Sequence, residues 1–124
     1  MLFSGLSKVF STIGERQYDE IGAFWDAMSA CYGMETLQGL GYRWTEDTIT
    51  YVIGFKNGAL PSEAAYSGAV YQQIQLPDAG WLQFAGRTEE LPQLYDRIYA
   101  DGALEYEIEE FFENGDCRIL VIRK

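Results

Sequence analysis

Residues 105–124 read EYEIEEFFENGDCRILVIRK, two β-rich runs joined by Asn114-Gly115. Asn-Gly between two such runs is a strong β-hairpin signal, because both residues tolerate the positive φ angles of a tight turn. A second pair of β-rich runs, LQGLGYRW and TITYVIGF, flanks Glu46-Asp47 and predicts another hairpin. The two turns lie 68 positions apart, and the rest of the chain can be aligned around them.

An amphipathic helix is predicted before each hairpin, because apolar residues recur at steps of three and four. The first apolar stripe ends at Gly33 and consists of Tyr18, Ile21, Trp25, Met28 and Tyr32. The second lies between Thr88, a predicted N-cap, and Gly102, and consists of Leu91, Leu94, Tyr95, Ile98 and Tyr99.

The two helices align at an offset of 70 residues, close to the offset of the turns. Strands are predicted before the helices at 7–13, 69–76 and 81–86. We therefore expect an α+β fold in one domain, residues 1–124. It would consist of two pseudo-symmetric β-α-β-β repeats, about 7–56 and 69–124, forming an antiparallel sheet with two helices packed on one side. A cleft where the repeats meet would suit a ligand.

The net charge is −10, from 19 acidic and 9 basic residues without histidine. Such a chain repels phosphate backbones, so direct nucleic-acid binding is not expected. No apolar run approaches 18 residues, so we expect no membrane span. Cys31 and Cys117 match no metal-ligand spacing, and free thiols fit a cytoplasmic protein. The acidity could also serve solubility alone.

Glu109 is the main candidate for chemistry. In a strand, residues 109 and 111 share one face and residues 108, 110 and 112 the other. Both faces carry apolar residues, so at least one glutamate should lie beside buried surface, where an unpaired carboxylate is unfavourable. The alternative is a solvated strand face, because five glutamates crowd together between residues 105 and 113.

Aromatic residues at core-compatible positions are the second candidate element. A carboxylate surrounded by aromatic faces can hold an organic cation, although for any single one of these residues plain core packing is the favoured explanation. The set is Trp25, Tyr51, Tyr71, Trp81, Tyr95 and Phe111. Arg43 could pair with Glu109 or Glu110 across the repeats, or lie exposed at a sheet edge.

Four segments together resemble the GyrI-like, AraC-type effector-binding family over nearly the whole chain. They are the Ile21-to-Trp25 helix step, LGYRW followed by ITYVIG, WLQFAG, and IEEF at 108–111, which is similar to the family's F-E-x-Y signature. Phe111 stands where tyrosine is usual, and no helix-turn-helix segment is fused to the domain.

The resemblance implies a bacterial, cytoplasmic, stand-alone domain that binds an amphipathic, cationic, drug-like molecule, with multidrug recognition as in the family's sensor domains. It assigns the pocket acid to Glu109. The expected ligand-binding residues are Glu109, Phe111, Trp25, Tyr51, Trp81 and Tyr71, with no cofactor and no metal. A homodimer is left open.

Two other functions remain open from the sequence. One is a hydrolase of electrophilic small molecules that uses Glu109 as general base on water. The other is a gyrase-inhibitor-like module whose acidic surface meets a basic protein. Without histidine, the chain has no Ser-His-Asp triad and no His-activated cysteine, and it has no phosphate-binding glycine loop.

The charge predicts that the protein alone does not bind duplex DNA. An electrophoretic mobility shift at physiological salt should show no complex at micromolar protein, since no cluster of Lys and Arg is present to release counterions. A retarded band at that concentration would contradict the prediction.

Overall fold

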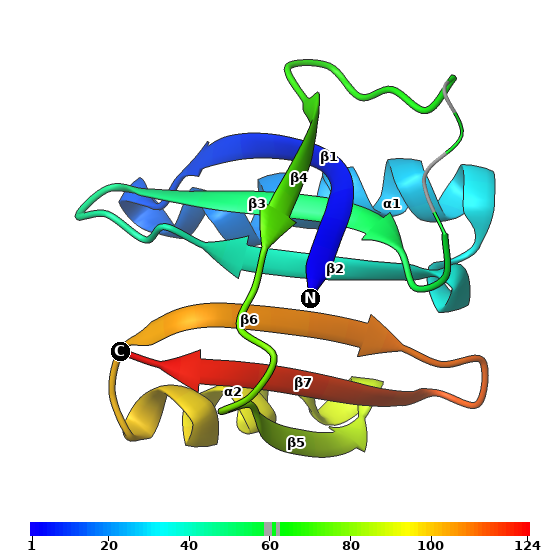
Figure 1. Ribbon diagram of the computed structural model, residues 1–124. Coiled ribbons are helices and arrows are strands. Elements are labelled where there is room, and N and C mark those ends of the chain that lie inside the picture. Colours follow the sequence, from blue (N-terminus) through cyan, green and yellow to red (C-terminus); the bar gives the residue numbers. More distant parts are fainter. Residues whose placement is uncertain (59–60, 62) are drawn as a thin grey trace.

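A computed structural model describes residues 1–58, 61 and 63–124 (Figure 1). It confirms an α+β fold in which an antiparallel sheet is combined with two helices. The strands are β1 (Leu2–Ser11), β2 (Leu37–Tyr42), β3 (Thr48–Phe55), β4 (Val70–Gln75), β5 (Leu82–Arg87), β6 (Leu104–Phe111) and β7 (Asp116–Arg123). The helices are α1 (Arg16–Tyr32) and α2 (Leu91–Ala100), and short 3-10 turns precede each helix and β2.

The strand order is β4-β1-β3-β2-β6-β7-β5, and every neighbouring pair is antiparallel. The hairpins β2–β3 and β6–β7 form as the sequence predicts. Their strands β2 and β6 pair at the centre of the sheet, where Leu40 lies opposite Ile108. This central pair joins the first half of the chain to the second.

The outer strands differ from expectation. Residues 69–76 were expected in the second repeat, but β4 pairs with β1 at one edge of the sheet, while β5 pairs with β7 at the other. The chain between them, residues 76–81, crosses the face of the sheet (Figure 1). β1 also begins at Leu2 rather than residue 7, because Phe3 and Leu6 are buried in different clusters and break the alternation that marks a strand.

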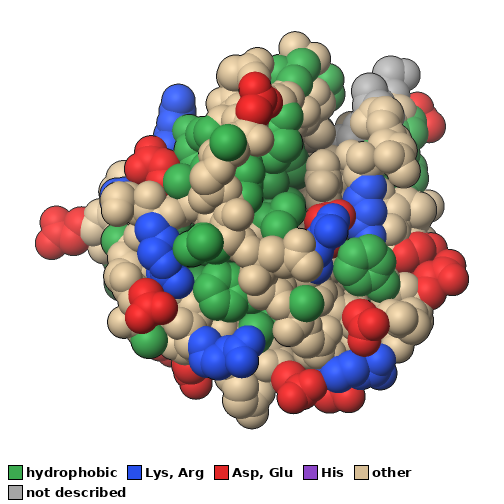
Figure 2. Space-filling view, turned by 60° about the horizontal axis from the view of Figure 1, so that its bottom comes forward, with side chains coloured by type: hydrophobic (Ala, Val, Ile, Leu, Met, Phe, Trp, Pro, Cys, Tyr) green, Lys and Arg blue, Asp and Glu red, His purple; other side chains and the backbone are tan. Residues whose placement is uncertain are grey.

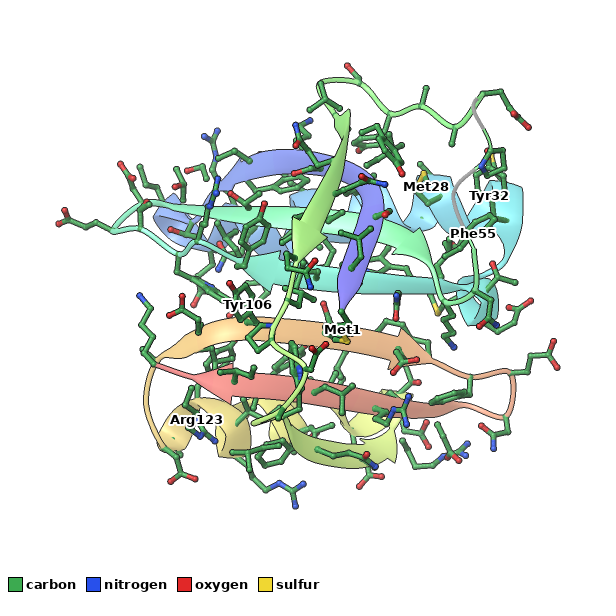
Figure 3. All side chains as sticks on the ribbon, in the orientation of Figure 1. Met1, Met28, Tyr32, Phe55, Tyr106 and Arg123 are labelled. Atoms are coloured by element: carbon green, nitrogen blue, oxygen red, sulfur yellow. The ribbon has the colours of Figure 1, made fainter. Side chains whose placement is uncertain are left out.

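Both helices pack on the same face of the sheet, where their apolar stripes join one core cluster. Phe24, Trp25 and Met28 come from α1, and Leu94 and Ile98 come from α2. The end of α1 is held by an edge-to-face contact between Tyr32 and Phe55, with ring centroids 5.3 Å apart (Figure 3). Thr88 does not act as the predicted N-cap. It opens a 3-10 turn, and its hydroxyl contacts the backbone of Asp116 on the neighbouring hairpin.

A second, smaller core cluster lies on the opposite face, under the crossing segment 76–81. It contains Phe3, Leu40, Tyr42, Val52, Leu76 and Ile108. Trp81 and Tyr106 pack against this cluster, with ring centroids 6.2 Å apart. Figure 3 labels Tyr106. Both faces of the central strands are therefore covered. None of the helices described is long and apolar enough to cross a membrane.

Candidate functional site

A cavity of about 390 Å³ lies between the helices and the centre of the sheet. The two helices form its walls, and strands β2, β3 and β6 form its floor. Its lining is mostly aromatic and apolar, and its charged lining residues are Asp26, Glu107 and Glu109. None of the residues that line it is lysine or arginine.

Glu109 lies on the helix-facing side of β6, partly buried at the cavity floor. Its two carboxylate oxygens are held by two tyrosines from different elements: the Tyr51 hydroxyl donates to Oε1 and the Tyr95 hydroxyl donates to Oε2. Tyr51 comes from β3 and Tyr95 from α2, so the carboxylate links the two halves of the chain.

Trp25 extends this hydrogen-bond chain to α1. Its indole Nε1 donates to the Tyr51 hydroxyl over 2.8 Å, in a buried contact. The Trp25 ring also meets Phe111 edge to face, with centroids 5.1 Å apart. An indole can only donate, so it fixes the Tyr51 oxygen as acceptor and directs the phenol proton toward Glu109.

Glu107 is a second carboxylate in the same cavity, and the sequence did not single it out. It lies two residues before Glu109 on the same face of β6 and is only 5% exposed. Tyr99 of α2 donates to its Oε2 over 2.8 Å. The alternation that placed residues 109 and 111 on one face also places residue 107 there, but its setting among other glutamates suggested a solvated face.

Burial changes the ionisation of both acids. Loss of solvent, together with the negative charge of Glu109, raises the pKa of Glu107 to about 8, although its tyrosine hydrogen bonds act in the opposite direction. Burial also raises the pKa of Glu109, while hydrogen bonds from Tyr51 and Tyr95 partly offset this by stabilising the charged form. Burial and the two carboxylates raise the pKa of Tyr51 and of Tyr95 well above their usual values, so both phenols stay proton donors.

Two glycines on β2 leave room for these carboxylates. Gly39 lies directly opposite Glu109, and Gly41 lies directly opposite Glu107. Directly opposite residues point to the same face of a sheet, so a side chain at either glycine would project into the site. A Cβ at Gly39 would overlap the Tyr51 hydroxyl and come within 2.9 Å of Trp25 Cζ2.

Four of the six residues predicted to bind a ligand line this one cavity: Glu109, Phe111, Trp25 and Tyr51. Tyr71 and Trp81 do not. Tyr71 is exposed on the edge strand β4, and Trp81 packs on the opposite face, where its indole donates to the Pro77 carbonyl. The residues next to Tyr71 and Trp81 in the sequence predict strands, but they do not indicate that β4 and the crossing segment lie away from the helices.

Of the two alternatives for Arg43, the structure has the exposed position and not the pairing with Glu109 or Glu110. Arg43 is exposed, with its guanidinium over the Tyr42 ring. Glu110 instead pairs with Arg118 of the neighbouring strand β7, with Nη2 2.6 Å from Oε1. Alternation along β6 puts this pair on the face opposite the cavity.

The site presents negative charge and aromatic surface to a ligand. Within the described residues, no group of three or more His, Cys, Asp or Glu side chains could hold a metal ion. On the molecular face shown in Figure 2, basic side chains are scattered among acidic and hydrophobic ones and form no patch. Comparisons of this chain with protein-family models, curated proteins and solved structures find no match.

The raised pKa of Glu107 predicts a pH-dependent stability. The folded protein holds a proton on Glu107 up to about pH 8, whereas the unfolded chain releases it near 4.5. The folded state therefore binds more protons, and the free energy of unfolding should fall as pH rises between those values. In urea titrations across this range, Glu107→Gln, which cannot ionise, should show a shallower decline than the parent. Parallel curves would contradict this assignment.

The close approach at Gly39 predicts a specific packing defect. Gly39→Ala should destabilise the protein by about 1–3 kcal/mol, because overpacking forces neighbouring side chains to move. It should also shift the Trp25 fluorescence, since the indole loses its place beside Tyr51. Gly22→Ala on α1 is the control, because its added Cβ would meet nothing within 4 Å. An unchanged urea midpoint for Gly39→Ala would show that the cavity floor yields easily.

Proposed function

We propose that the protein binds a small amphipathic organic cation in this cavity, and that it is a GyrI-like effector-binding domain, as its sequence motifs suggest. One observation carries the proposal: the buried Glu107 and the partly buried Glu109 lie among aromatic side chains, and none of the described residues that line the cavity is basic. The two free cysteines, Cys31 and Cys117, fit the reducing cytoplasm that we propose as its location.

The electrostatics of the empty site favour a cation. A buried carboxylate without a counter-charge is unfavourable, and such a group takes up a proton or meets a positive ligand. Here the protein supplies hydrogen bonds from tyrosines but no positive charge near either acid. The net charge of −10 also raises the local concentration of cations around the protein.

The lining suits the apolar body of such a ligand. Trp25, Trp44, Tyr95 and Phe111 offer ring surfaces around the carboxylates, and aromatic faces attract cations through their quadrupoles. A volume of about 390 Å³ falls within the range of about 300–1,000 Å³ that small-molecule sites occupy. The cavity therefore fits one compact, ring-bearing molecule.

Binding is better supported than hydrolysis. A general base needs a carboxylate with accessible lone pairs and sufficient basicity. Both oxygens of Glu109 already accept hydrogen bonds from Tyr51 and Tyr95. Each of these bonds stabilises the charged form and partly offsets the rise in pKa that burial causes.

We also propose that the two halves are copies of one β-α-β-β unit, to which β4 has been added. The strand orders β1-β3-β2 and β5-β7-β6 support this, since each half has the same succession around its helix. Leu40 and Ile108, which pair at the centre, are 68 positions apart, the offset of the two predicted turns. The cavity would then lie at the pseudo-twofold axis. An experimental structure whose halves do not superpose would contradict the duplication.

Removing the charge of Glu109 tests the binding function. Glu109→Gln should lower the affinity of the protein for a cationic dye by one to two orders of magnitude, because a hydrogen bond or ion contact to a charged group contributes about 1.5–3 kcal/mol. Binding of a neutral dye of the same shape should change little, since ring contacts supply that part. Fluorescence titrations of Glu109→Gln and of the parent with each dye would measure the two affinities.

Glu105→Gln is the matched control, because Glu105 is an exposed glutamate on the same strand. Glu110 is a poorer control, since it holds Arg118 on the opposite face. If Glu109→Gln binds the cationic dye as the parent does, the carboxylate is not the cation site. Equal losses in Glu105→Gln would mean that only overall charge matters.

A further inference from the structure

The two carboxylates differ in how far the protein satisfies them. Glu109 accepts one tyrosine hydroxyl on each oxygen, from Tyr51 and Tyr95. Glu107 accepts only the Tyr99 hydroxyl, on Oε2. The Tyr95 hydroxyl also lies near Glu107, but its single proton is donated to Glu109. No described residue donates a hydrogen bond to Oε1 of Glu107, and this oxygen stays accessible from the cavity although the residue as a whole is only 5% exposed.

A second unsatisfied acceptor lines the same cavity. Oε1 of Gln17, in the first turn of α1, is buried and has no hydrogen-bond partner among the described residues. Buried acceptors are nearly always paired in folded proteins, and an unpaired one calls for an explanation. A ligand with N–H groups would donate to the accessible Oε1 of Glu107, whereas a quaternary ammonium ion has no proton to donate.

We propose that the cavity selects an organic dication with two protonated nitrogens, one held by Glu109 and the other by Glu107, and that Glu107 determines the preference for two charges over one. This inference rests on the proposed cation-binding function and names its ligand class. A single protonated nitrogen is held by Glu109, whose charge two phenols already stabilise. The second nitrogen donates to Oε1 of Glu107 and supplies the counter-charge that lets Glu107 release the proton it holds below about pH 8.

The spacing of the acids limits the ligand. Residues 107 and 109 are two positions apart on one strand, so their backbones are roughly 7 Å apart. Two nitrogens that meet both carboxylates must be separated by a short linker of similar reach. The aromatic walls favour a ring as that linker, which gives a bis(aminomethyl)arene or a compound of similar shape.

Benzylamine and 1,3-bis(aminomethyl)benzene form a matched pair of probes, because they share one ring and carry one or two ammonium groups at neutral pH. Isothermal titration calorimetry should show the parent protein binding the diamine about tenfold or more tightly than benzylamine, the expected effect of one additional charged hydrogen bond. Glu107→Gln should bind the two probes within about threefold of each other, because only one carboxylate then remains to meet a protonated nitrogen.

Glu107→Met, an uncharged variant of similar length, should lose the preference in the same way, and circular dichroism would check that both variants fold. Glu105→Gln should keep it. Equal affinities of the parent for the two probes, or a preference that survives in both Glu107 variants, would overturn the dication assignment. The cation-binding function would still stand if Glu109→Gln lowered the affinity of the protein for benzylamine. If neither amine bound the parent and Glu109→Gln left dye binding unchanged, both proposals would fail.

Discussion

The burial of two carboxylates on the helix-facing side of β6 is the constraint on which the site depends. Neither Glu107 nor Glu109 has a basic partner, so each relies on hydroxyl donors from elsewhere in the fold. Those donors come from β3 and α2, the elements that close the cavity. Gly39 opposite Glu109 is the corresponding steric requirement, since a larger residue there would displace the Tyr51 phenol.

Local patterns in the sequence were sufficient to predict most of the helices and strands and to predict which residues of β6 share one face. Alternation along β6 separates Glu109 and Phe111 from Glu110, and the structure has Glu110 paired with Arg118 on the other side. The helical stripe placed Trp25 toward the sheet. Glu107 follows the same alternation, but it was not recognised as a site residue. The neighbouring glutamates indicated a solvent-exposed face, and a sequence does not distinguish exposed from buried glutamates.

What the sequence could not predict depends on contacts between distant residues. The strand character of residues 70–75 is local, whereas their pairing with β1 is decided by which edge is free after the hairpins have formed. Tyr71 and Trp81 were therefore assigned to the wrong surroundings. The hydrogen-bond chain from Trp25 through Tyr51 to Glu109 likewise requires the packing of α1, β3 and β6 together, and no spacing in the sequence encodes it.

The segment that crosses the back of the sheet bears on how the cavity can adapt. Leu76 is almost fully buried beneath the central strands and Trp81 packs beside it, so the strands that carry the carboxylates are braced from behind. The floor of the cavity is therefore rigid, and it holds Glu107 and Glu109 at fixed positions. Tyr18, which lines the cavity from α1, is instead 66% exposed and has room to rotate, whereas Tyr99 is held by its hydrogen bond to Glu107. For the proposed cationic ligands, differences in shape would be accommodated at this rim. The fixed carboxylates at the base would select the number and spacing of the ligand's charges.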